Sequence, residues 1–321
     1  MEISLLIDNL SNPALLFFFL GVIATRLKSD LEIPHNTSKF ISLYLLLAIG
    51  FKGGQELAHS ELNASILWQI IFGIALSVVV PLYSFFILRK KFSIQNSGAI
   101  AAAYGSVSAV TFVTAISFLD LKQIVYGGQM VAIMAVMEAP AIIVGVLLVS
   151  LYDKEGDKKP SFGSLLKHSF TNGSVVLILG SLIIGFLASE QHAQGIKPFT
   201  TEIFKGFLAV FLLDMGLQSG KNIFALVKKG WYPFAFAIVI PFVNGCIVAF
   251  VSHWITPEPG NQLLFAILAA SASYIAVPAA MKIALPKSDS AIYLPMALGI
   301  TFPFNITIGL PVYYFIISAV N

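Results

Sequence analysis

Two short polar stretches interrupt apolar segments that are otherwise long enough to cross a membrane. The first reads "YGSVS" at residues 104–108, and the second reads "SASYIAVP" at residues 271–278. Pro278 removes a backbone hydrogen-bond donor and Gly105 relaxes the backbone, so both stretches favour broken helices. Unwound backbone inside a membrane is tolerated only where it is buried in protein or lines a hydrated cavity. The two stretches therefore predict a binding site where two helices break.

A break in a helix exposes a half-helix N-terminus with free N–H groups and about half a positive charge. Two such ends that meet near the middle of the membrane form a site for a small anion without a buried arginine. The loose carbonyls and serine hydroxyls of the same segments are oxygen ligands suited to Na⁺. The pattern indicates a small anion that moves together with sodium. The alternative is that the small residues only allow close packing of helices.

Glu138 lies near the middle of an apolar segment, directly before a proline. Ionisable groups at such depth are costly and are functional candidates by default. The equivalent segment near the C-terminus carries Thr301 and Asn305, and the three side chains together would form an oxygen-rich cluster for a cation. We therefore predict a role for Glu138 in sodium or proton coupling. The alternative is a structural hydrogen bond to backbone that the proline leaves unpaired.

Three further residues are candidates for supporting roles. Asp214 lies about one turn inside a polar segment end, which favours a structural role. Tyr274 lies beside the second break and either gates the site or packs as an aromatic side chain. Pro278 fixes the position of the break itself.

The composition excludes several classes of protein. Apolar residues make up 57% of the 321 positions and charged residues 11%, whereas a soluble domain needs about 25% charged residues to cover its surface. The chain is therefore predicted to be an integral membrane protein in contact with lipid. The net charge of +3 gives no indication of nucleic-acid binding, and the single cysteine and five histidines form no transition-metal pattern. Without a nucleophile–base pair, neither an enzyme nor a cofactor is expected, apart from Na⁺ as the coupling ion.

Apolar stretches of about 20 residues are long enough to cross the hydrocarbon core. We predict ten spans, at residues 13–27, 39–57, 65–88, 97–118, 124–152, 173–189, 199–219, 231–255, 261–284 and 289–319. Alternate connections between these spans hold 15 of the 19 basic residues. Positive residues concentrate in cytoplasmic loops, so both termini are expected outside and the central linker inside.

The two halves of the chain resemble one another. "IGFKGG" at 49–54 matches "MGLQSG" at 215–220, and "MEAPAIIVG" at 137–145 matches "TFPFNITIG" at 301–309. The two polar stretches also match, which places Ser106 on Ser271. The matches lie in the same order at a nearly constant offset, so a duplication is predicted.

Because each half has five spans, the second copy must insert with the opposite orientation. The predicted fold is all-α and integral to the membrane, with ten transmembrane helices in two inverted five-helix repeats. The repeats would comprise residues 1–152 and 171–321, joined by a cytoplasmic linker at 153–170. This architecture is typical of secondary transporters.

At these same motifs the sequence resembles the sodium-dependent bicarbonate transporter family, best known from cyanobacteria. The resemblance runs over most of the chain and is most specific at "YGSVSAVTF", "MEAPAIIVG", "AASASYIAVPAAMK" and "GITFPFNITIGLP". It implies that broken helices four and nine cross in a core domain packed on a gate domain, that members form homotrimers, and that Glu138 stands at an acidic position of the family. The substrate-binding positions that it implies are Gly105, Ser106, Val107, Ser108, Thr111, Ser271, Ala272 and Ser273.

Two departures from the family pattern leave alternatives open. The cyanobacterial pattern has an aspartate where this chain has Tyr274, which leaves the cargo and the number of sodium ions open. The central linker is shorter, which leaves open whether the small trimeric signalling protein of the family binds. The first hypothesis is a Na⁺-coupled bicarbonate symporter of the bacterial inner membrane. The alternatives are a sodium- or proton-coupled transporter of another small anion, such as a carboxylate, and a membrane sensor with a transport fold.

Overall fold

The computed structural model describes residues 12–59, 64–153, 163, 167, 171, 173–227 and 230–321. Regular structure in these residues is helical throughout, and none of them lies in a β-strand. Most of the predicted linker at 153–170 lies outside the described residues, so its predicted cytoplasmic location stays a prediction.

A helix or a group of successive helices occupies each of the ten predicted ranges. In chain order they are α2 (Pro13–Arg26), α3 (His35–Ala58), α4 (Ala64–Leu88), α5 (Ile94–Gly105), α6 (Ala109–Leu121), α7 (Gln129–Tyr152), α9 (Gly173–Leu187), α10 (Glu190–Lys197), η1 (Pro198–Glu202), α11 (Ile203–Val227), α12 (Trp231–Val251), η2 (Ser252–Trp254), α13 (Pro259–Ala270), α14 (Ala276–Ala284), α15 (Ser290–Leu294), η3 (Pro295–Thr301), α16 (Phe302–Phe304), η4 (Asn305–Gly309) and α17 (Leu310–Val320).

Six helical stretches of the described chain are long and apolar enough to cross a membrane: Ala64–Leu88, Ile94–Leu121, Gln129–Tyr152, Glu190–Lys221, Trp231–Trp254 and Ser290–Val320. Three shorter apolar helices, α2, α9 and α13, have 10–17 residues. The chain therefore has the helices of a membrane protein, and the prediction of ten crossings stays a prediction.

Both interrupted helices break where the polar stretches predict it. Helix α5 ends at Gly105 and α6 begins at Ala109, while α13 ends at Ala270 and α14 begins at Ala276. At the first break Ser108 is extended and its side chain accepts a hydrogen bond from the backbone N–H of Thr111, which starts the new helix. The Ser108 side chain therefore caps the N-terminus of α6 directly after the break.

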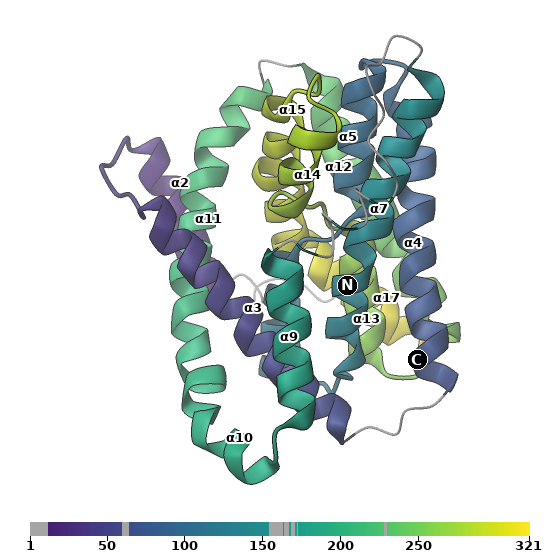
Figure 1. The fold of residues 1–321 in the computed structure, drawn as a ribbon. Coiled ribbons are helices and arrows are strands. Elements are labelled where there is room, and N and C mark those ends of the chain that lie inside the picture. Colours follow the sequence, from purple (N-terminus) through teal and green to yellow (C-terminus); the bar gives the residue numbers. More distant parts are fainter. Residues whose placement is uncertain are drawn as a thin grey trace.

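The helices form two groups (Figure 1). Helices α2, α3, α9 and α11 make one layer, and a thicker bundle of α4–α7 with α12–α17 lies beside it. Within the layer, α3 packs along α9 and α2 packs along α11. The bundle also contacts the layer through η3, which lies against α11.

Glycines allow the closest helix crossings in the layer. A Cβ atom on Gly216 of α11 would lie 2.0 Å from the carbonyl oxygen of Phe18 in α2. A Cβ atom on Gly185 of α9 would lie 2.2 Å from the carbonyl oxygen of Phe51 in α3. Because these contacts are made by backbone atoms, a side chain at either glycine would force the two helices apart.

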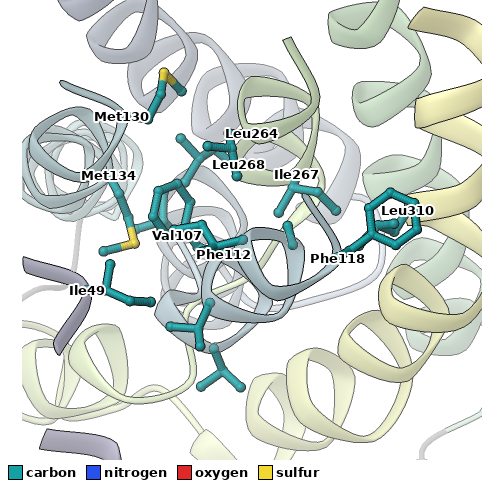
Figure 2. Close-up of a cluster of buried hydrophobic side chains, with 14 of the residues drawn as sticks. Ile49, Val107, Phe112, Phe118, Met130, Met134, Leu264, Ile267, Leu268 and Leu310 are labelled. Carbon is teal, nitrogen blue, oxygen red and sulfur yellow. The ribbon is translucent and has the colours of Figure 1, made fainter. Parts of the chain in front are cut away.

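The two breaks lie inside the best-packed part of the bundle. All residues of α13 from Leu263 to Ala270 are 0–3% exposed. Figure 2 shows Met134 of α7, together with Leu264 and Leu268 of α13, gathered around Val107 and Phe112. The unwound backbone is thus surrounded by protein, which is the condition for breaking a helix at membrane depth.

Candidate binding site at the two helix breaks

The two breaks contact each other directly. The backbone N–H of Ser273 donates to the carbonyl oxygen of Ala103 over 2.8 Å. The backbone N–H of Ser108 donates to the Oγ of Ser271 over 3.0 Å. Each break therefore satisfies backbone groups that the other leaves free, and residues about 165 positions apart become neighbours.

Three of the predicted serines hydrogen-bond with the backbone around the breaks. Ser108 Oγ accepts from the N–H of Thr111 over 3.2 Å, and Ser273 Oγ accepts from the N–H of Val277 over 3.4 Å. Ser271 Oγ donates to the carbonyl oxygen of Leu268 over 3.0 Å. These hydroxyls hold the helix ends in place, and each oxygen keeps a lone pair or proton for a further partner.

A small cavity lies at the crossing, with a volume of about 30 Å³. This volume is enough for a water molecule or a small ion. Both breaks, helix α7 and the layer all contribute to its lining, which consists of Leu46, Val107, Ser108, Ala109, Glu138, Ser174, Ser273, Tyr274, Ile275 and Ala276. The structure thus brings five of the predicted site residues together: Val107, Ser108, Glu138, Ser273 and Tyr274.

Two buried hydroxyls, on residues close in sequence to the cavity lining but not part of it, have no hydrogen-bond partner. Ser106 is 0% exposed and Thr111 is 1% exposed, and neither Oγ nor Oγ1 makes a hydrogen bond. An unsatisfied buried hydroxyl costs about 1–3 kcal/mol. Ser106 directly precedes the cavity-lining residues Val107 to Ala109, and Thr111 follows them by two positions. Such groups are rare in folded proteins and call for a reason, and a bound ligand would supply their missing partners.

Gly105 and Ala272 are placed by packing. A Cβ atom on Gly105 would lie 2.3 Å from the ring of Pro81 in α4, so only glycine lets the two helices approach so closely here. Ala272 is 3% exposed between the two serines of the second break. Small side chains at both positions keep the breaks narrow.

Thr301 and Asn305 do not line the cavity with Glu138. The Thr301 hydroxyl donates to the carbonyl oxygen of Ala237 over 2.7 Å and lies 2.8 Å from the hydroxyl of Tyr104. Asn305 Nδ2 donates to the carbonyl oxygen of Ala270 over 2.6 Å. Their predicted role as sodium ligands stays a prediction. Their hydrogen bonds connect Thr301 to Tyr104, next to the first break, and Asn305 to Ala270, at the second break.

Sequence reasoning missed this support of the second break. Ala270 is the last residue of α13, so its carbonyl has no partner within a continuing helix, and Asn305 provides one. Asn244 of α12 likewise donates to the carbonyl oxygen of Ala269 over 3.3 Å and accepts from the hydroxyl of Tyr83. An asparagine inside an apolar span could have indicated this support, because a broken helix requires donors for its freed carbonyls.

The three supporting candidates lie in different parts of the fold: Asp214 in α11 of the layer, Tyr274 in the second break and Pro278 in α14. The buried carboxylate of Asp214 accepts hydrogen bonds from Ser38 and, over 2.8 Å, from Gln218, as a structural role requires. Tyr274 lines the cavity, and its hydroxyl lies 3.8 Å from the sulfur of Met215. Pro278 is the third residue of α14, where its missing N–H removes no intrahelical hydrogen bond.

Comparison with protein families identifies a match. The model of the Na⁺-dependent bicarbonate transporter superfamily matches residues 13–318, which is nearly the whole chain. No curated protein matches the chain. The matched range includes both breaks, the cavity and all residues that line it.

Proposed function

Because the chain belongs to the Na⁺-dependent bicarbonate transporter superfamily, we propose that it is a symporter that couples bicarbonate uptake to the entry of Na⁺. The observation that carries this proposal is the cavity between two broken helices, with unpartnered hydroxyls beside it. The hydroxyls and helix N-termini around the cavity are donors for a small anion, and its hydroxyl and carboxylate oxygens are ligands for a small cation.

Sodium would bind at the side of the cavity where Glu138 lies. Its carboxylate and the hydroxyl oxygens of Ser108 and Ser273 line the same small volume. Na⁺ prefers oxygen ligands, and a carboxylate provides the negative charge that offsets the lost hydration of the ion. Because Glu138 lies directly against both breaks, sodium there would favour the arrangement in which the breaks hold their anion.

Bicarbonate would bind at the N-termini of α6 and α14. Both helices begin beside the cavity, and their first N–H groups and dipoles favour a negative charge. The hydroxyls of Ser106 and Thr111 would donate to the anion and so gain the partners they lack. Binding of a sodium ion next to the anion also offsets the charge that each would carry alone into a dry site.

Release on the other side of the membrane would follow from movement of the bundle against the layer. The repeat supports this mechanism, since inverted repeats exchange conformations to open a site to alternate sides. The contacts are consistent with such a repeat: α3 packs on α9 in the same way that α2 packs on α11, and each crossing has glycine at the closest point. On this proposal the bundle is the core domain and the layer is the gate domain.

The cell-level parts of the proposal follow from the family and the charge pattern. We place the protein in the bacterial inner membrane as a homotrimer, with both termini outside. Binding of a small trimeric signalling protein would involve the linker at 153–170, most of which lies outside the described residues.

Uptake by proteoliposomes tests the proposal. Labelled bicarbonate is supplied with and without an inward Na⁺ gradient, and the wild type is compared with Glu138→Ala and Ser273→Ala. Sodium-dependent uptake that both substitutions abolish supports the symport and the site. Uptake of labelled small carboxylates in place of bicarbonate would reassign the cargo, and ligand-induced stabilisation without any uptake would favour a sensor.

A further inference from the structure

One ion pair joins the layer to the bundle. Lys52 Nζ lies 3.0 Å and 2.9 Å from the two carboxylate oxygens of Asp120. Lys52 belongs to α3 of the layer, and Asp120 lies in the last turn of α6, on the far side of the first break. The two groups are in direct contact, with Nζ 2.9 Å from Oδ2. The pair therefore connects the helix that starts at the binding site to the other group of helices.

The ion pair lies beside a very close backbone contact. A Cβ atom on Gly128, just before α7, would lie 2.0 Å from the carbonyl oxygen of Gly53 in α3. The ammonium group of Lys52 lies 5.3 Å from the centre of the Tyr126 ring. Layer and bundle are thus in contact here through backbone, charge and an aromatic ring.

This contact lies at the end of the molecule where α10 is found (Figure 1). Lys52 and Asp120 share a small cavity with Thr200 and Thr201 of η1, which directly follows α10. The binding cavity is lined by Leu46, six residues earlier in α3, which is about 9 Å along the helix axis. Its rim includes half-buried Ser174 at the start of α9, which is the end of that helix away from α10. The ion pair therefore lies closer to the α10 end than the part of α3 that lines the binding cavity.

We propose that Lys52 and Asp120 form a latch that closes the binding site toward the α10 end and opens when cargo is exchanged on that side. This inference rests on the proposed transport, because it requires two states of the protein. The strength of the pair suits such a role. Its side chains are 30% and 35% exposed, and pairs exposed to this degree are weak enough to break within a transport cycle.

The latch makes a quantitative prediction about access. Loss of an ion pair that is about one-third exposed shifts a two-state equilibrium by about two- to five-fold. Lys52→Gln and Asp120→Asn should therefore each raise the population open toward the α10 end by that factor. Lys52→Glu places two carboxylates together and should raise it further, whereas the exchanged pair Lys52→Glu with Asp120→Lys should return it to the wild-type value.

Thiol labelling measures this population. The native thiol is removed by Cys246→Ser, and Ala109→Cys introduces a reporter in the cavity lining. A membrane-impermeant thiol reagent is applied to oriented proteoliposomes from each side in turn. Lys197→Gln serves as the matched control, because it removes an exposed lysine of α10 at the same end of the molecule.

Faster labelling from the α10 side in both neutral variants, with recovery in the exchanged pair and no change in the control, supports the latch. Equal rates in all variants, or faster labelling without recovery in the exchanged pair, would overturn it. Labelling from the opposite side in every variant checks that the protein is folded. Since labelling needs no cargo, a failed latch and a failed bicarbonate symport give different results.

Discussion

The hydroxyls of Ser106 and Thr111 have no hydrogen-bond partner, so substitutions there can distinguish an effect on ligand binding from an effect on folding stability. Neither oxygen makes a hydrogen bond within the protein, so Ser106→Ala and Thr111→Val remove no stabilising contact. They remove instead an unsatisfied buried group, which costs about 1–3 kcal/mol in the unliganded state. The free energy of unfolding should therefore stay the same or rise in both variants.

The same substitutions should weaken the apparent affinity of transport for the anion, although they do not lower stability. A hydrogen bond to a charged partner contributes about 1.5–3 kcal/mol, which corresponds to about 10- to 150-fold in affinity. If each hydroxyl donates to the anion, each substitution should raise the half-saturating anion concentration by that factor. Uptake by proteoliposomes gives this concentration, and thermal unfolding in detergent gives the stability of the same preparations.

Two serine substitutions serve as matched controls. Ser97 of α5 is also fully buried, and its hydroxyl has no hydrogen bond. It lies nine residues before Ser106, about 13 Å along the helix. Ser97→Ala should leave uptake unchanged. Ser271→Ala removes a hydroxyl that bonds Ser108 N–H and the Leu268 carbonyl, so it should destabilise the protein by about 1–3 kcal/mol. A stability loss in Ser106→Ala with an unchanged half-saturating concentration would refute the assignment of that hydroxyl to the anion.

Three further predictions test the structure around the site. Gly216→Ala should destabilise the protein by about 1–3 kcal/mol in thermal unfolding, because its Cβ would lie 2.0 Å from a carbonyl oxygen of α2, whereas Gly206→Ala, with open space around it, should not. Asn305→Leu leaves the Ala270 carbonyl unpaired and should cost about 1–3 kcal/mol, and equal stability of this variant would contradict the support we assign to it. Glu138→Gln keeps the size of the side chain but removes its charge, so Na⁺-dependent stabilisation should disappear; retained sodium dependence would place the cation elsewhere.

The helix breaks could be predicted from the sequence, but their support could not. Prolines, glycines and serines within apolar spans have local effects on the backbone, so "YGSVS" and "SASYIAVP" indicate breaks without knowledge of the fold. The partner of the Ala270 carbonyl lies 35 residues away, at Asn305. Distant partners of this kind depend on how helices pack. For that reason the sequence could not predict that Thr301 bonds the Ala237 carbonyl of α12 and that Asn305 bonds the Ala270 carbonyl at the end of α13, while their role as cation ligands stays a prediction.

The matched positions of the two halves have unequal roles in the structure. The sequence alignment places Ser106 on Ser271. The Ser106 hydroxyl has no partner, whereas the Ser271 hydroxyl bonds two backbone groups. Alignment of Pro140 with Pro303 places Glu138 on Thr301. Glu138 lines the cavity, whereas Thr301 bonds Tyr104 and a backbone carbonyl. In the first half, the Ser106 hydroxyl has no partner and Glu138 lines the cavity. In the second half, Ser271 and Thr301 form hydrogen bonds with groups at or beside the first break. If the site arose by the predicted duplication and binds one anion and one cation as proposed, one set of ligands is sufficient and the second set is free to stabilise the crossing. The first half should therefore be the more sensitive to substitution in transport, and the second half the more sensitive in stability.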